Sequence, residues 1–249
     1  MNLYRTPTIF ATFPHLLSAE STRHGGVSPF PYHSLNLGTN TNDSPEYCTE
    51  NRRRFWQALG ISENQVASSY QVHGDSIKTV TNPGQDKGYD ALITNKKEVI
   101  LAVTVADCTP ILIYDSGQAA VAAIHAGWRG TAKQIVAKTI QQMKAEFGTR
   151  PVDCYAYIGT CIDACAFEVG PEVAEQFDSP FKSYSPEAGK YLIDLKKANA
   201  AQLTEQGIPI SQIEISPYST VQNNGDYFSY RLENGTTGRM LACIGLRQS

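Results

Sequence analysis

Two apolar stretches that lie close together in the chain constrain its fold more than any other feature. The first comprises 99–105 and 111–114, the second comprises 119–125, and all are rich in Val, Ile, Leu and Ala. Uninterrupted apolar strands of this kind are typical of strands covered on both faces. Reactive side chains occupy the points where these patterns stop, Cys108 in the first stretch and His125 in the second. We therefore expect adjacent buried strands that carry a thiol and an imidazole at their ends.

Helices and strands interleave along the rest of the chain without a strict βαβ repeat. The predicted helices cover 45–60, 131–147, 171–178 and 194–206, and further strands are predicted over 66–80 with a break at His73-Gly74, 153–160, 211–216 and 239–246. This order predicts an α+β fold of mixed β-sheets flanked by helices. Because 249 residues contain no low-complexity linker, we expect a single domain over 1–249.

The composition excludes several classes of partner. The chain has 21 basic and 24 acidic residues and no run of five like charges, so it lacks the features of a nucleic-acid-binding protein. It contains no stretch of eighteen apolar residues that could span a membrane. Pro7 and Pro14 interrupt any signal-peptide core, and six cysteines are too few for a disulfide scaffold. We expect a cytoplasmic protein, monomeric, that acts on small molecules.

Three residues with metal-binding side chains each lie where a strand pattern ends: His73, Cys108 and His125. Two imidazoles and one thiol suit zinc, which accepts sulfur and nitrogen and keeps an open position in catalytic sites. Their spacings of 35 and 17 residues are not those of a compact zinc finger. Taken singly, each residue is more simply explained as a buried Cys or a hydrogen-bonded core His, and the residues alone do not decide between this explanation and a metal site.

Longer motifs occur around these residues and along most of the chain. They are GGVSPFPYHSLNLGTN at 25–40, ENRRR at 50–54, QVHG at 71–74, ADCTPILIYD at 106–115, AIHAGWRG at 123–130, IGTCI at 158–162, FEVG at 167–170 and FSYRLENGTTGRM at 228–240. In this order they closely resemble the YfiH-like laccase-domain family, whose members are labelled polyphenol oxidase, peptidoglycan editing factor or purine nucleoside phosphorylase.

The resemblance implies both a fold and a ligand set. It implies a YfiH-like single domain of mixed sheets and helices, with one zinc ion per chain bound by His73, Cys108 and His125. Copper is the less favoured metal. The resemblance further implies that Asn36, in SLNLG, and Arg52, in ENR, approach the substrate or its phosphate.

The chain departs from the usual family pattern at Ala166, where members often have an aromatic neighbour to the FEVG-type segment, and at two further positions. Thr160 stands where members of the family commonly have Pro, and Ser219 stands where many have Cys before Thr. Any role of that Cys in relatives is therefore in doubt for this chain. The proposed zinc ligands are not affected.

The conflicting family labels leave several chemistries open. Five histidines in total cannot furnish the imidazoles that multicopper centres need, so polyphenol oxidation is at most a side activity. Cys108 could instead act as the nucleophile of a thiol hydrolase with a histidine as base, but a zinc-bound thiolate is a poor nucleophile. Zinc chemistry with His73, Cys108 and His125 as the catalytic residues is therefore preferred.

The resulting hypothesis is a zinc-dependent purine nucleoside enzyme. It would cleave adenosine, inosine, guanosine and methylthioadenosine with phosphate, giving the base and (deoxy)ribose 1-phosphate, and would deaminate adenosine. Arg52 and the Gly-Trp-Arg-Gly turn at 127–130 would bind the phosphate. Asp107 and Glu168 are candidate proton donors.

Two alternatives use the same metal site. One is a peptidoglycan-precursor editing amidase, which would remove a wrong amino acid from a UDP-linked muramyl substrate. The other is a zinc-stabilised binding protein without catalytic activity, in which the metal would serve folding.

Overall fold

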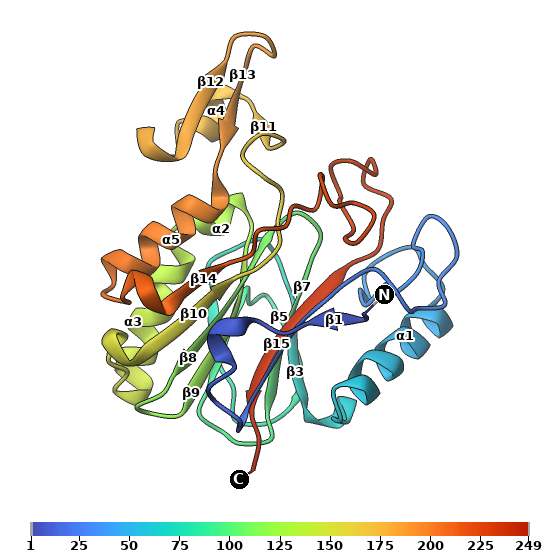
Figure 1. Cartoon of the computed structure of the whole chain (residues 1–249), viewed down its shortest axis with the longest axis vertical. Helices are drawn as coiled ribbons and strands as arrows, with labels where there is room; N and C mark the ends of the chain where they lie inside the picture. Colours follow the sequence, from blue (N-terminus) through green and yellow to red (C-terminus); the bar gives the residue numbers. More distant parts are fainter. Residues whose placement is uncertain (1, 249) are drawn as a thin grey trace.

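Two six-stranded mixed sheets form the body of the molecule, and a three-stranded sheet forms a smaller lobe above it (Figure 1). The structure is a computed structural model and describes residues 2–248. In spatial order, the first sheet contains β1 (Tyr4–Arg5), β2 (Leu16–Ser21), β15 (Met240–Leu246), β7 (Ile100–Val105), β3 (Val66–Tyr70) and β5 (Gly84–Lys87). The second contains β14 (Ile213–Ile215), β10 (Cys154–Ile158), β8 (Thr109–Asp115), β9 (Ala120–Ala126), β6 (Ala91–Thr94) and β4 (Ile77–Thr79), and the lobe contains β11 (Glu168–Val169), β13 (Lys190–Ile193) and β12 (Lys182–Ser185).

Helices cover the outer faces of the two large sheets. They are α1 (Pro45–Ala58), α2 (Trp128–Ala132), α3 (Ile135–Phe147) and α5 (Leu195–Glu205), whereas α4 (Pro171–Ala174) lies in the lobe beside β11 and β13. Turns of 3₁₀ helix lie at Thr8–Phe10, Glu63–Gln65, Pro151–Asp153, Ser179–Phe181 and Ile210–Gln212. In Figure 1, α1 lies on one side of the body, and α3 and α5 lie on the other. The predicted α+β fold of mixed sheets flanked by helices is confirmed. Between residues 2 and 248, no helix has the length and apolar character needed to cross a membrane.

The central strands β8 and β9 are buried along their whole length because both of their faces are covered. Their side chains alternate, so that Leu112 packs between the two sheets with Leu101 of β7. Its neighbour Ile111 points the other way and packs under α3, against Ile140. Each fully buried side chain of this size contributes about 1.5–3 kcal/mol of transfer free energy. The continuous apolar pattern of these strands therefore reflects coverage by a sheet on one side and helices on the other.

Helix boundaries differ from the sequence prediction in two regions. The single helix predicted over 131–147 is divided into α2 and α3, because Gln134 adopts a left-handed conformation with φ 65°. Tertiary hydrogen bonds hold the end of α2 in this position, since Gln202 Nε2 donates to the Thr131 carbonyl at 2.9 Å. Asn199 Nδ2 also donates to Thr131 Oγ1 at 3.1 Å. The helix predicted over 171–178 is likewise shorter, comprising α4 alone.

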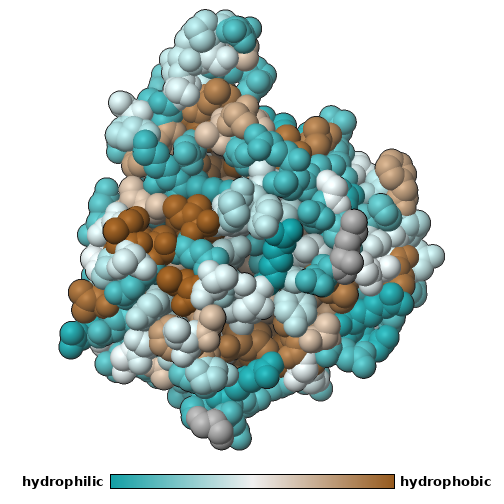
Figure 2. Space-filling model, in the orientation of Figure 1, coloured by the Kyte–Doolittle hydropathy of each residue, from teal (hydrophilic) through white to brown (hydrophobic). Residues whose placement is uncertain are grey.

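The hydropathy of the surface is uneven (Figure 2). Most of the face shown is hydrophilic, and its largest apolar patch lies on the body below the lobe, on the side of α5 and β14. The lobe has an apolar cluster of its own, to which Phe167, Phe177 and Ile193 contribute, and this cluster continues onto α5 through Leu195. The expectation of one domain over 1–249 stays a prediction.

A buried carboxylate links the first sheet to the end of β10. Glu20 of β2 is 1% exposed and accepts hydrogen bonds from Tyr157 Oη at 2.7 Å, Thr160 N at 2.6 Å and Thr160 Oγ1 at 3.0 Å. Burial raises the pKa of Glu20, and these donors partly oppose that effect. A proline at position 160 would remove two of the three donors, so Thr160 has a structural role in this chain.

We predict that Thr160→Val lowers the free energy of unfolding by about 1–3 kcal/mol, because the substitution keeps the shape but leaves a buried carboxylate oxygen short of a donor. Urea unfolding monitored by circular dichroism measures the change. The matched control is Thr6→Val, since Thr6 is exposed, and its substitution changes stability by less than about 0.5 kcal/mol. Equal stabilities of the two variants would contradict the prediction.

Candidate metal centre

The three predicted metal ligands converge at one end of the two large sheets. His73 follows β3, Cys108 lies between β7 and β8, and His125 is near the end of β9. Their ligand atoms lie within 4.8 Å of one another, and the two imidazole rings meet edge to face with centroids 4.8 Å apart. A zinc ion bonded to sulfur at about 2.3 Å and to nitrogen at about 2.0–2.1 Å requires a convergent set of this kind. The structure thus brings together residues that are 35 and 17 positions apart in the sequence.

Asp90, immediately before β6, holds both histidines in place. His125 Nδ1 lies 2.8 Å from Asp90 Oδ1, which leaves Nε2 of the ring to face the candidate site. The same carboxylate accepts hydrogen bonds from the backbone N–H groups of Val72 at 3.2 Å, His73 at 2.9 Å and Gly74 at 2.7 Å. Asp90 was not predicted from the sequence to belong to the site. The one feature that could have indicated it is its position directly before the apolar strand ALIT.

The electrostatics of the site favour a thiolate ligand. Burial alone would raise the pKa of Cys108, but the adjacent imidazoles, above all that of His125, outweigh burial and lower this pKa to about 6. Burial likewise opposes charge on His125, yet Cys108 and Asp90 raise the pKa of His125 to about 9. Hydrogen bonds from His125 and the backbone overcome burial and keep the pKa of Asp90 below its usual range. A thiolate is the form of Cys that binds metals, so the donor set fits a soft or borderline ion such as zinc.

Two residues of the site adopt left-handed backbone conformations, which are unfavourable for residues other than glycine. They are His73, with φ 57°, and Asp107, with φ 81°. Such positions cost about 1–3 kcal/mol each and persist only where surrounding contacts fix them. Asp107 is fixed by hydrogen bonds from Thr220 Oγ1 at 2.5 Å and Arg231 N at 2.6 Å. Its carboxylate is therefore already engaged, which favours a structural role over that of a proton donor.

A cavity of about 560 Å³ opens beside the metal ligands. Its size is within the usual range for sites that bind small molecules. Three aromatic side chains in its lining are Trp128 of α2, Phe167 directly before β11, and Tyr230 of the loop between β14 and β15. These rings offer flat apolar surfaces of the kind on which a heteroaromatic base stacks.

Three arginines also line this cavity, and in the described part of the chain none of them forms an ion pair with a carboxylate: Arg129, Arg231 and Arg239. Burial lowers the pKa of Arg239 and outweighs the effects of Cys108 and Asp107, which act on it at longer range. Arg231 and Arg239 donate to backbone carbonyls through Nη1, at 2.7–3.4 Å. The Arg129 guanidinium lies 4.2 Å from the centroid of the Trp128 ring. Such cations without an acidic partner make the cavity suited to an anion. Arg239 lies in the TGRM motif and was not predicted from the sequence to belong to the site.

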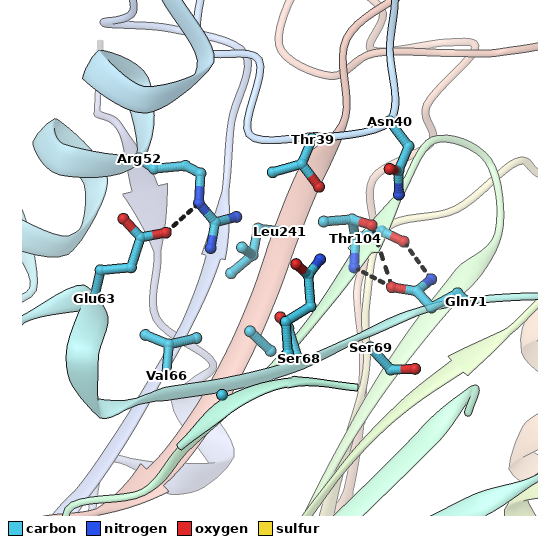
Figure 3. Close-up of a pocket in the computed structure, with 13 residues that line it drawn as sticks. Thr39, Asn40, Arg52, Glu63, Val66, Ser68, Ser69, Gln71, Thr104 and Leu241 are labelled. Atoms are coloured by element: carbon cyan, nitrogen blue, oxygen red, sulfur yellow. Dashed lines mark hydrogen bonds and ion pairs between the residues drawn. The ribbon is translucent and has the colours of Figure 1, made fainter. Parts of the chain in front are cut away.

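The two predicted substrate-binding residues lie away from the metal ligands. Asn36 is 0% exposed, and its Oδ1 accepts hydrogen bonds from Gly38 N at 3.1 Å and Arg239 N at 2.9 Å. Asn36 thus holds the backbone of two cavity-lining residues. Arg52 lines a smaller adjoining pocket, where its Nε lies 2.5 Å from Glu63 Oε1 (Figure 3). That either residue contacts substrate stays a prediction.

Comparison with known proteins identifies the family. Residues 18–247 match the family described as multi-copper polyphenol oxidoreductase laccase. The chain belongs to this laccase-like family. It is 38% identical over 246 residues to the purine nucleoside phosphorylase of Deinococcus radiodurans, covering 98% of this chain and 92% of that protein. It is 35% identical over 252 residues to purine nucleoside phosphorylase YlmD of Geobacillus stearothermophilus, covering 95% of this chain and 92% of YlmD.

Solved structures agree with this family assignment. The crystal structure of YlmD from Geobacillus stearothermophilus superimposes with a TM-score of 0.93 at 33% identity, covering 99% of this chain and 97% of YlmD. A second similar structure, the hypothetical protein YfiH of Bacillus licheniformis, gives a TM-score of 0.91 at 29% identity, covering 99% of this chain and 100% of that protein. The family predicted from the motifs is confirmed.

The copper chemistry in the family's name does not fit the donor set of this laccase-family chain. Multicopper centres need many imidazoles, whereas within residues 2–248 His73, Cys108 and His125 form the one convergent group of potential ligands. Two further histidines have partners elsewhere, since His15 lies 2.7 Å from Tyr114 Oη and His24 lies 2.7 Å from Asp226. The site therefore fits a single metal ion.

We predict that Asp90→Asn lowers the affinity for zinc by about 10- to 100-fold, because the ring of His125 and the backbone of His73 lose their common anchor. Titration against a chromophoric chelator measures the affinity, and urea unfolding verifies that the variant is folded. The control is Asp86→Asn, which removes a surface carboxylate that pairs with Lys78 at 3.2 Å and leaves the site untouched. An unchanged affinity in a folded Asp90→Asn variant would contradict the anchoring role.

Proposed function

We propose that the chain is a zinc-dependent purine nucleoside enzyme. It cleaves adenosine, inosine, guanosine and methylthioadenosine with phosphate, yielding the free base and (deoxy)ribose 1-phosphate, and it deaminates adenosine. The observation that carries this proposal is one cavity in which the His-Cys-His group, unpaired arginines and aromatic rings face a common space. The relatives from Geobacillus stearothermophilus and Deinococcus radiodurans are named purine nucleoside phosphorylases, and these names support the phosphorolytic activity.

The arginines of the cavity account for the anionic co-substrate. In phosphorolysis, an oxygen of hydrogen phosphate forms a bond to C1′ while the bond from C1′ to the purine nitrogen breaks, and the leaving base takes up the proton that the hydrogen phosphate gives up. Phosphate carries its charge into a partly buried space, so it requires cations that are not already neutralised. Arg129, Arg231 and Arg239 meet this requirement, whereas Arg52 is neutralised by Glu63.

The aromatic side chains and the ligand set account for the purine. Trp128, Phe167 and Tyr230 present surfaces on which the base can stack. In the deamination, water adds its oxygen at C6 of adenosine and ammonia leaves. Zinc, when bound, acts as a Lewis acid and lowers the pKa of a coordinated water molecule. His73, Cys108 and His125 would hold that ion, and Asp90 would keep their orientation fixed.

The proposal predicts two separable activities. The zinc-loaded protein is incubated with adenosine, with and without phosphate, and the products are separated. Adenine and ribose 1-phosphate are expected only with phosphate, whereas inosine is expected in both cases. Arg239→Gln should lower the phosphorolytic kcat/KM by about 10- to 150-fold, equivalent to about 1.5–3 kcal/mol, while inosine formation persists.

Two control variants define the specificity of this result. Cys108→Ala should abolish both activities but leave the protein folded, because the core between the sheets does not depend on its thiol. Arg53→Ala, which removes a guanidinium that pairs with Glu50 at 2.7 Å on the surface of α1, should change neither. If no nucleoside reacts and a UDP-linked muramyl amide is cleaved instead, the editing amidase replaces this proposal.

A further inference from the structure

A second, smaller pocket adjoins the metal cavity (Figure 3). It has a volume of about 230 Å³ and lies between the loop after β2, the start of the 3₁₀ turn Glu63–Gln65, and strands β3 and β5. The residues that line both spaces are Thr39, Asn40, Ser69, Gln71 and Thr104. The metal cavity and the smaller pocket therefore meet at these five residues and form one continuous depression.

Uncharged polar side chains dominate the lining of the smaller pocket. Thr39 and Asn40 point into it from the loop above, and Ser68 lines it from β3 (Figure 3). Across the part of the chain that the structure describes, the side chains of these three residues have no hydrogen-bond partner. Gln71, in contrast, is fixed by hydrogen bonds with the backbone of Thr104, each 2.8 Å long. The pocket thus offers free hydroxyl and amide groups on a rigid frame, which suits a polar ligand.

The charge of this pocket differs from that of the metal cavity. The one cation in its lining, Arg52, is paired with Glu63 and also donates from Nη1 to the Leu37 carbonyl at 3.2 Å. The Glu63 side chain is 49% exposed, so its carboxylate can contact a ligand. The Arg52 side chain is only 12% exposed. An anion entering the pocket would lie against the carboxylate without an unpaired cation to balance it. A neutral group is therefore favoured.

We propose that this pocket receives the neutral C5′ end of the nucleoside, and that Glu63 excludes nucleosides carrying a 5′-phosphate. The inference rests on the proposed nucleoside phosphorolysis. The base and the attacking phosphate need the aromatic rings and the unpaired arginines, all of which line the metal cavity. C1′ must lie between the base and the attacking phosphate. The C5′ end of the ribose is then directed past the residues common to both spaces and into the smaller pocket.

The chemistry of the pocket suits the C5′ groups of the proposed substrates. A 5′-hydroxyl can donate a hydrogen bond to the Glu63 carboxylate, whereas a phosphate at pH 7 has no proton to donate in its dianionic form and is repelled. Val66, Ala102 and Leu241 form an apolar part of the lining that can accept a methylthio group. Glu63 is thus a specificity-determining residue that contacts the substrate and takes no part in bond breaking.

The test compares inosine with inosine 5′-monophosphate in the zinc-loaded protein and in Glu63→Gln. Glutamine keeps the size of the side chain and can still accept the hydrogen bond from Arg52. The ratio of kcat/KM for the monophosphate to that for inosine should rise at least about tenfold, because the repulsion is removed. Glu50→Gln is the control, since Glu50 also pairs with arginines, Arg53 and Arg54, but on the outer surface of α1. It should leave the ratio unchanged.

A second variant tests the location independently of charge. Ser68→Val narrows the pocket on a strand that favours β-branched residues, and should lower kcat/KM for methylthioadenosine at least about threefold more than for adenosine. Ser183→Val, at an exposed position of β12, is the matched control.

The outcomes separate this inference from the proposed function. If both ratios stay unchanged while inosine and adenosine are still cleaved, the inference is overturned and the proposed function stands. If the unaltered protein cleaves no nucleoside, the proposed function fails, and the inference fails with it. Isothermal titration provides a further readout, since Glu63→Gln must bind inosine 5′-monophosphate more tightly than the unaltered protein does.

Discussion

The candidate site depends on one buried carboxylate, that of Asp90. It joins the ring of His125, at the end of β9, to the backbone of the loop that carries His73 after β3. β3 and β9 belong to different sheets, so Asp90 fixes the relative position of two strand ends that no backbone ladder connects. The Asp90 carboxylate accepts hydrogen bonds from three backbone N–H groups, and these bonds also fix the left-handed conformation of His73. Without this anchor, the ligand atoms would converge only by chance, and a metal site needs them held within a small tolerance.

Charge is divided unequally between the two connected spaces, and this division suggests how a substrate is oriented. In the described residues, the arginines of the metal cavity lack carboxylate partners, while Arg52 in the adjoining pocket has Glu63. Anions are therefore drawn to the side where the metal ligands and the aromatic rings lie. The neutral C5′ end of the nucleoside is accepted in the adjoining pocket, beside Glu63. The same distribution would place a nucleoside with its glycosidic bond beside the phosphate, which is the geometry that phosphorolysis requires.

Local sequence patterns predicted the central strands and the longer helices, but they missed β6 and the strands of the lobe, and they did not predict the contacts between elements. The apolar runs of β8 and β9 predicted their burial because coverage on both faces leaves a continuous signal. The ligand set was distinguished from ordinary core residues only through the family motifs. The break at Gln134, the role of Asp90 and the unpaired Arg239 were missed. Each depends on partners distant in the chain, as when Asn36 bonds the backbone of Arg239, 203 positions away, and no periodicity records such pairs.

Direct determination of the metal coordination is the most decisive measurement. X-ray absorption at the zinc edge of the purified, zinc-loaded protein reports the type, number and distance of the bonded atoms. The account predicts one sulfur at about 2.3 Å and two imidazole nitrogens at about 2.0–2.1 Å, with the remaining position filled by a light atom. A coordination shell without sulfur, or one unchanged in Cys108→Ser, would contradict the assignment of His73, Cys108 and His125 as the metal centre.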